Sequence, residues 1–227
     1  MTSSPGATFV KICGITRPED AQAAVRAGAN ALGFVLAASP RRIDLPAAAA
    51  IARHVHPSVA TVGVFVDATA AEVLDAIEAV CLQGVQLHGD VPDGLVAEVR
   101  AARPHAFIVQ AVRVDPGGAG HPLAMAEGID AVMVDSKDPR HPTERHGPVP
   151  ARWLAAWMAG PRPERVIVAG GLTPSTVGDL VREVRPWGVD VSGGVEGAPG
   201  VKDPALVRAF LHAVRAADAV LPVEAPG

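Results

Sequence analysis

Short apolar runs with β-forming residues recur along this chain at spacings of about 23 to 34 residues, each followed by a segment with helical features. This spacing accommodates one strand and one crossover helix. Some runs are continuously apolar, as in Val132-Met133-Val134, which is typical of strands buried on both faces of a parallel sheet. The pattern predicts eight strands, at residues 8–13, 31–36, 60–65, 84–87, 107–112, 131–134, 165–168 and 188–191.

Prolines mark the expected starts of five connecting helices, because a proline in the first turn costs no hydrogen bond. They are Pro18, Pro46, Pro92, Pro174 and Pro204. Asp90, Thr173 and Asp203 are predicted to cap three of these helices, and Gly28 to end the first one. A short fifth helix is expected within residues 122–127.

Eight strand–helix units in one chain favour a single (β/α)8 TIM barrel over an open doubly wound sheet. No strand is followed by the G-x-G-x-x-G turn that would mark a dinucleotide-binding sheet. We expect one barrel domain at residues 8–216, with flexible tails at residues 1–7 and 217–227.

The composition, with 49% hydrophobic and 19% charged residues, provides a sizeable core and lacks the signature of disorder. The net charge of −4 is spread along the chain without a basic block, so we expect no nucleic-acid or membrane partner. We see neither a secretory signal nor an apolar segment of the roughly 18 residues that a membrane span needs. A cytoplasmic location is expected.

The two cysteines, Cys13 and Cys81, lie far apart in different contexts, so we expect neither a disulfide nor a metal site. Cys81 follows Ala79-Val80 at the end of a predicted helix, and we expect it in the core.

Glycine pairs follow the last two predicted strands, as Gly170-Gly171 and as Gly193-Gly194 after Ser192. In a barrel these two loops are neighbours, and their backbone N–H groups would form a cradle for a phosphate group. Each pair alone would also fit a simple tight turn, but two pairs at consecutive strand ends favour a phosphorylated small-molecule ligand.

Cys13 and Asp135 each end a predicted strand, where a barrel presents its chemistry. A thiolate at position 13 would serve as a general base, and a carboxylic acid at position 135 as a general acid. Alternatively, Cys13 is a small core residue and Asp135 a capping or salt-bridging residue.

Four further polar residues lie near strand ends and are candidates for substrate binding. Arg41 would hold a carboxylate with two parallel hydrogen bonds, unless it is a plain surface charge. Lys11, His88 and Asp190 would contact the substrate, although His88 would equally suit ordering its loop and Asp190 bracing the phosphate loop.

The segment VKICGIT at residues 10–16 resembles the opening motif of the phosphoribosylanthranilate isomerases, a family of barrel enzymes. Further motifs occur in the family's order over residues 9 to about 212. They are ALGFV (31–35), SPR (39–41), VGVFV (62–66), VQLHG (85–89), DSK (135–137), AGGL (169–172), VDVSGGVE (189–196) and PGVKD (199–203).

The resemblance implies a cofactor-free Amadori rearrangement of N-(5-phosphoribosyl)anthranilate to 1-(2-carboxyphenylamino)-1-deoxyribulose 5-phosphate, a step of tryptophan biosynthesis. By this resemblance Asp135 protonates the ring oxygen, Cys13 removes the C2′ proton and Arg41 holds the anthranilate carboxylate. The glycine loops hold the phosphate.

Two stretches depart from the family pattern. Only Gly147 remains of a glycine-rich motif that the family usually carries at 142–148, and Ser192-Gly193-Gly194 replaces the usual Ser-Ser-Gly. The first change leaves open a related aminoaldose-phosphate isomerase or a non-catalytic barrel that binds phosphate esters. The sequence also leaves a monomer and a homodimer equally open.

Overall fold

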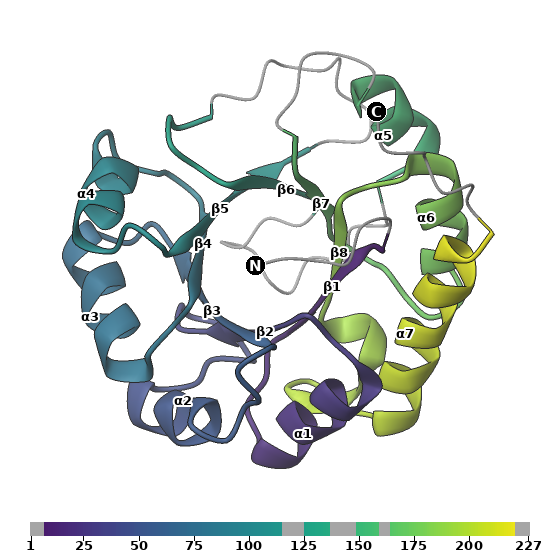
Figure 1. Cartoon of the computed structure of the whole chain (residues 1–227), viewed down its shortest axis with the longest axis horizontal. Helices are drawn as coiled ribbons and strands as arrows, with labels where there is room; N and C mark the ends of the chain where they lie inside the picture. Colours follow the sequence, from purple (N-terminus) through teal and green to yellow (C-terminus); the bar gives the residue numbers. More distant parts are fainter. Residues whose placement is uncertain (1–6, 115–124, 137–148, 159–163, 221–227) are drawn as a thin grey trace.

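The fold is a closed barrel of eight parallel strands that pair in chain order, with β1 returning to pair with β8. The computed structural model describes residues 7–114, 125–136, 149–158 and 164–220. Helices surround the barrel on its outside (Figure 1). This arrangement confirms the predicted (β/α)8 TIM barrel.

The barrel strands agree with the predicted ranges to within one residue at each end. They are β1 (Phe9–Cys13), β2 (Ala31–Val35), β3 (Ala60–Val66), β4 (Gly84–His88), β5 (Phe107–Arg113), β6 (Ala131–Asp135), β7 (Val166–Val168) and β8 (Gly188–Val191). A small antiparallel pair, β9 (Glu196–Ala198) and β10 (Val201–Lys202), follows β8 and the 3-10 turn η1 (Gly193–Val195).

The described helices are α1 (Pro18–Ala27), α2 (Leu45–Ala52), α3 (Ala70–Val80), α4 (Leu95–Ala102), α5 (Ala151–Met158), α6 (Val177–Val184) and α7 (Pro204–Asp218). Pro18 and Pro204 begin their helices, and Pro46 is the second residue of α2. The caps at Asp203 and Gly28 are as predicted, because Asp203 accepts hydrogen bonds from two backbone N–H groups and Gly28 adopts a left-handed conformation with φ 91°.

Two predicted helix starts are wrong. Helix α4 begins at Leu95 behind Gly94, whose φ of 86° reverses the chain after Pro92, so Asp90 does not cap it. Helix α6 begins at Val177 behind Thr176. Thr173 lies one turn earlier, where its carbonyl accepts hydrogen bonds from the N–H groups of Thr176 and Val177.

Two further predictions about the helices need revision. The short helix expected at 122–127 is not seen at residues 125–127, and residues 122–124 lie outside the described part of the chain. Cys81 is exposed instead of buried. It ends α3 in a left-handed conformation with φ 57°, which turns its side chain away from the core that Val80 enters.

Helix α7 continues two residues past residue 216, the predicted end of the domain. It ends at Asp218, whose carboxylate accepts hydrogen bonds from the N–H of Thr8 at 3.0 Å and from its hydroxyl at 2.6 Å. The last helix is thereby fixed to the first strand. Residues 1–6 and 221–227, most of the two predicted tails, lie outside the described residues.

Aromatic residues fill the barrel at the end where the strands begin. The rings of Phe9 and Phe107 stack on Trp187, with centroid distances of 4.6 and 5.9 Å. The guanidinium group of Arg165 lies 5.6 Å from the Trp187 ring. Because this end is packed, the opposite end is the one that can open into a cavity.

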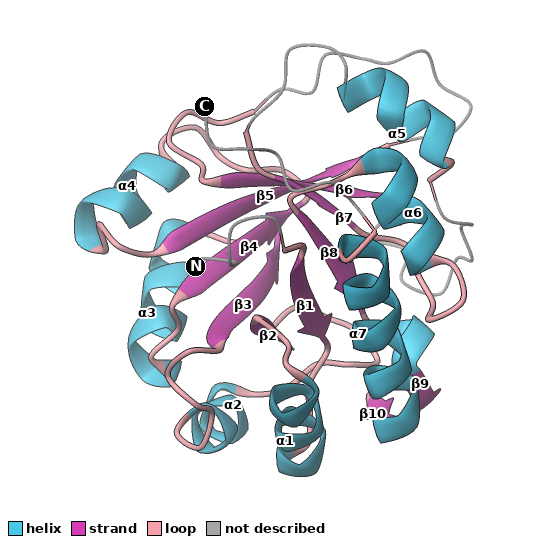
Figure 2. Cartoon of the chain, turned by 45° about the vertical axis from the view of Figure 1, so that its right-hand side comes forward, coloured by secondary structure: helices cyan, strands magenta, loops and turns pink. Residues whose placement is uncertain are grey.

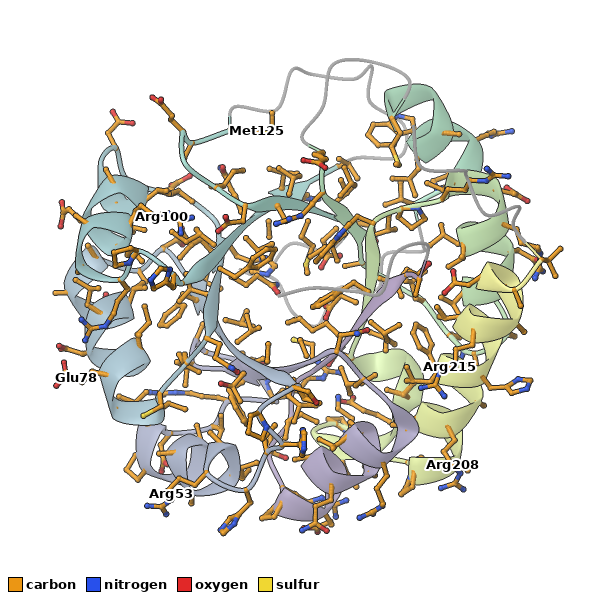
Figure 3. The ribbon with its side chains drawn as sticks, in the orientation of Figure 1. Arg53, Glu78, Arg100, Met125, Arg208 and Arg215 are labelled. Atoms are coloured by element: carbon orange, nitrogen blue, oxygen red, sulfur yellow. The ribbon has the colours of Figure 1, made fainter. Side chains whose placement is uncertain are left out.

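The helices cover the outer faces of the strands (Figure 2). The main hydrophobic core lies between these two layers. Charged side chains such as Arg53, Glu78 and Arg208 point outward from this helical layer (Figure 3). Among the described residues, no helix is both long and apolar enough to cross a membrane.

We expect Asp203→Ala to lower the free energy of unfolding by about 1 kcal/mol, because it removes the side-chain acceptor at the N-terminus of α7. Urea unfolding followed by circular dichroism measures this change. Asp203→Asn is the matched control, since asparagine caps about as well as aspartate, and an equal loss in both variants would contradict the capping role.

Candidate active site

A cavity of about 620 Å³ opens at the carboxyl ends of the barrel strands. Ten of the eleven residues predicted to form the site line it: Cys13, Arg41, His88, Asp135, Gly170, Gly171, Asp190, Ser192, Gly193 and Gly194. The eleventh, Lys11, lies beneath the cavity with 2% of its surface exposed. Residues separated by up to 181 positions in the sequence therefore share one site.

Lys11 is inside the barrel because alternate residues of a strand face the same side. Phe9, which packs in the floor, is followed on this face by Lys11 and then by Cys13. Lys11 lies opposite Asp190 in the register of β1 and β8, and its Nζ donates a hydrogen bond of 2.8 Å to the carboxylate. A Cβ on Gly33 would come within 2.9 Å of both this Nζ and the Cys13 sulfur, so glycine gives these side chains room to converge.

Burial and the charge of Lys11 act in opposite directions on the pKa of the Cys13 thiol. Burial raises the pKa of Cys13 above its ordinary value, while the neighbouring positive charge of Lys11 opposes this increase. Burial also disfavours the charge on Lys11, but attraction to Asp190 and Cys13 outweighs it and raises the lysine's pKa to about 12. Cys13 thus has a permanent cation beside it, which would stabilise a thiolate.

Asp135 is the last residue of β6 and presents its carboxyl group to the cavity. Gly170, which has a φ of 86°, passes so close that a Cβ at this position would lie 2.7 Å from the Asp135 Oδ1. A glycine is therefore required at position 170 so that the loop after β7 can come close to the Asp135 carboxyl group.

The two glycine loops are packed directly against each other. A Cβ on Gly194 would lie 1.8 Å from the carbonyl oxygen of Leu172, which follows the Gly170-Gly171 pair. Backbone N–H groups on such closely packed glycine loops can approach an anion without side chains in the way.

Arg41 belongs to a partly buried charge network that the sequence did not reveal. Its Nε and Nη2 donate parallel hydrogen bonds of 2.8 Å to the two carboxylate oxygens of Glu196. Glu196 Oε1 also lies 2.7 Å from Nζ of Lys202, which in turn donates to the carbonyl and hydroxyl oxygens of Ser192 at 3.3 Å. The network thus joins the predicted carboxylate-binding arginine to the loop after β8.

The network combines two positive charges and one negative charge. Burial favours the neutral form of Glu196, but hydrogen bonds from Arg41 and Lys202 outweigh it and lower the pKa of Glu196. Arginine has five N–H donors, so its pairing with Glu196 leaves Arg41 further donors for a ligand. The uncompensated positive charge suits an anionic group in the cavity.

His88 lies two residues after Gln86 on the same, inward face of β4, and its Nε2 is hydrogen-bonded to the Gln86 side-chain nitrogen. Burial, together with the charge of Lys11, lowers the pKa of His88 to about 4. The imidazole is therefore neutral near pH 7. Among the described residues, no cluster of His, Cys, Asp and Glu could hold a metal ion.

Comparison with known proteins gives the same assignment along nearly the whole chain. Residues 10–213 match the family model described as N-(5'phosphoribosyl)anthranilate (PRA) isomerase. The chain belongs to this family. The N-(5'-phosphoribosyl)anthranilate isomerase of Thiobacillus denitrificans is 44% identical over 215 residues, which cover 92% of this chain and 99% of that protein.

Solved structures of the family have the same fold. The phosphoribosyl anthranilate isomerase from Thermus thermophilus superposes with a TM-score of 0.79 at 38% identity, covering 92% of this chain and 99% of that one. A second one was solved in complex with reduced 1-(o-carboxyphenylamino)-1-deoxyribulose 5-phosphate, and is 30% identical with a TM-score of 0.76 over the same shares of the two chains. The unusual stretch at 142–148 lies outside the described residues.

We expect Gly194→Ala to disrupt the packing of the two glycine loops, because its Cβ would collide with the backbone of Leu172. The variant should lose about 1 to 3 kcal/mol of stability through overpacking and should bind phosphate esters more weakly. Thermal unfolding measures the change in stability. Calorimetric titration with reduced 1-(o-carboxyphenylamino)-1-deoxyribulose 5-phosphate measures the change in affinity. Gly197→Ala is the control, because its Cβ would meet nothing within 4 Å, and similar behaviour of the two variants would count against this role of Gly194.

Proposed function

We propose that this protein is a phosphoribosylanthranilate isomerase of tryptophan biosynthesis, which converts N-(5-phosphoribosyl)anthranilate to 1-(2-carboxyphenylamino)-1-deoxyribulose 5-phosphate. The observation that carries the proposal is that Cys13 and Asp135 line one cavity together with both glycine loops. A proton donor, a proton acceptor and an anion site are the parts that an aldose–ketose rearrangement of a phosphate ester requires.

The proposed reaction begins at Asp135. Its carboxylic acid donates a proton to the ring oxygen of the ribosyl group, and the bond from this oxygen to C1′ breaks. The lone pair of the anilino nitrogen forms the C1′=N bond of a Schiff base. General acid catalysis by a positioned carboxyl group makes this step possible near neutral pH.

Cys13 then acts as the base. Its thiolate takes the proton from C2′, the electrons shift to form a C1′=C2′ double bond, and the Schiff base becomes an enolamine. Tautomerisation, with a proton added at C1′, gives the C2′ ketone of the product. The Lys11 cation supports the thiolate that burial alone would disfavour, and Asp190 holds this lysine in place.

Each of the two anionic groups of the substrate has a candidate partner in the cavity, although Arg41 lies beside the loop after β8. We propose that the loops after β7 and β8 bind the phosphate through their N–H groups. Arg41, oriented by Glu196, would bind the anthranilate carboxylate through its remaining donors. Holding both ends would place C1′ and C2′ between Asp135 and Cys13.

A cytoplasmic location is part of this proposal. One barrel supplies every proposed role, so the reaction requires no second subunit and the proposal applies to a monomer and to a homodimer alike. The specific alternative is a related isomerase with another aminoaldose phosphate as substrate, since the stretch at 142–148 departs from the family motif.

We expect the purified, chelator-treated protein to convert N-(5-phosphoribosyl)anthranilate without added metal or cofactor, and its gene to restore growth of a tryptophan auxotroph that lacks this step. The fall in anthranilate-type fluorescence of the substrate measures turnover. Activity on another aminoaldose phosphate alone would favour the related isomerase, and tight binding without turnover would favour a non-catalytic barrel.

We expect Asp135→Asn to reduce kcat by at least about a hundredfold while changing ligand affinity little, because the amide cannot donate the proton that opens the ring. Steady-state kinetics measures kcat, and titration with reduced 1-(o-carboxyphenylamino)-1-deoxyribulose 5-phosphate measures the affinity. Asp130→Asn is the matched control, since Asp130 precedes the same strand and pairs with Arg100 outside the cavity. Near-normal kcat in Asp135→Asn would exclude it as the acid.

A further inference from the structure

Gln86 differs from the other glutamines of this chain in the bonding of its side-chain oxygen. The chain has four glutamines. The Oε1 of Gln83 accepts from the N–H of Thr61 at 3.0 Å, and that of Gln110 from the N–H of Ala126 at 2.8 Å. Gln22 accepts from Arg26 at 3.4 Å. The Oε1 of Gln86 is buried and has no hydrogen-bond partner among the described residues.

The position of Gln86 directs this oxygen to the cavity. Gln86 lies in the middle of β4 with its side chain inside the barrel, is 2% exposed and lines the cavity together with His88 above it. Both neighbouring strands present only apolar side chains here, Val64 and Val66 from β3 and Val109 and Ala111 from β5, which have no donor to offer. A donor for the Gln86 oxygen therefore has to come from within the cavity.

The contact with His88 occupies the nitrogen end of the Gln86 amide. A neutral imidazole carries a lone pair on one ring nitrogen, and Nε2 of His88 faces the NH₂ group of Gln86. In the tautomer that carries its lone pair on Nε2, His88 accepts from the Gln86 nitrogen, and the carbonyl oxygen remains an unused acceptor. A buried acceptor without a partner costs free energy, so such groups in folded proteins nearly always have one.

We propose that the Gln86 carbonyl oxygen accepts a hydrogen bond from a sugar hydroxyl of the substrate and makes Gln86 a specificity-determining residue. This inference rests on the proposed function. Of the substrate's polar groups, the phosphate and the carboxylate are acceptors near pH 7. The anilino N–H lies ortho to the carboxylate and can bond to it internally, so the hydroxyl groups are the donors that remain.

The test combines a change in the protein with a change in the ligand. The affinity of reduced 1-(o-carboxyphenylamino)-1-deoxyribulose 5-phosphate is measured for the wild type and for Gln86→Met, which keeps the volume but removes the acceptor. The same is done for a set of analogues that each lack one sugar hydroxyl. We expect Gln86→Met to weaken the parent ligand about tenfold, and one analogue to bind equally to both proteins.

Gln110→Met is the matched control, because Gln110 is also a buried barrel glutamine but its oxygen bonds to backbone. It should show no such dependence on the ligand. If Gln86 is merely structural, its replacement will weaken all ligands by the same factor, and that result would overturn the proposal. Gln86→Leu replaces the methionine variant should the latter not fold.

Two outcomes separate this inference from the proposed function. If the wild type binds every analogue as tightly as the parent, no hydroxyl has a partner in the site and the inference is wrong, whatever the variants do. If the wild type fails to turn over phosphoribosylanthranilate, the proposed function is wrong. Normal turnover together with uniform ligand affinities rejects the role of Gln86 alone.

Discussion

The pairing of β1 with β8 is the constraint on which the rest of this protein depends. It closes the sheet, and its register sets Lys11 beside Asp190 in the interior. Two charges buried in this way are tolerable only as a hydrogen-bonded pair, because an isolated charge would meet a large desolvation cost. The same register brings the β8 loop next to the end of β1, so closure of the fold and assembly of the site are one event.

The strands were predictable because the physics that forms them is local and strong. A strand covered by helices on one side and barrel interior on the other reads as an apolar run such as Val166-Ile167-Val168, with few alternatives. Helix starts are less certain, since Gly94 and the turn after Thr173 postpone two helices beyond their prolines. The exposure of Cys81 was also not predictable, because the hydrophobic pattern does not indicate that α3 ends there in a left-handed conformation.

The site likewise contains residues that the sequence indicates and contacts that it does not. Residues at strand ends, such as Cys13, Asp135 and the glycine pairs, could be found because the barrel topology brings those positions together. Glu196 belongs to a motif but its partner Arg41 is 155 residues away, and no local spacing indicates that contact. The orphaned oxygen of Gln86 likewise becomes visible only when every neighbour in space is known. Sequence patterns indicate which groups lie at the site, whereas their hydrogen-bond partners depend on the folded structure.

The contact between Thr8 and Asp218 has a consequence for how the chain could be connected. These residues are 210 positions apart and yet directly hydrogen-bonded, so the first strand and the last helix meet as closely as consecutive units do elsewhere in the ring. The gap in the covalent chain between them is then one junction among eight in a circular arrangement. The order of strand and helix contacts around the barrel therefore does not depend on which unit comes first in the chain. A circularly permuted gene that joins residues 8 and 218 through a linker and opens another outer loop would encode the same contacts.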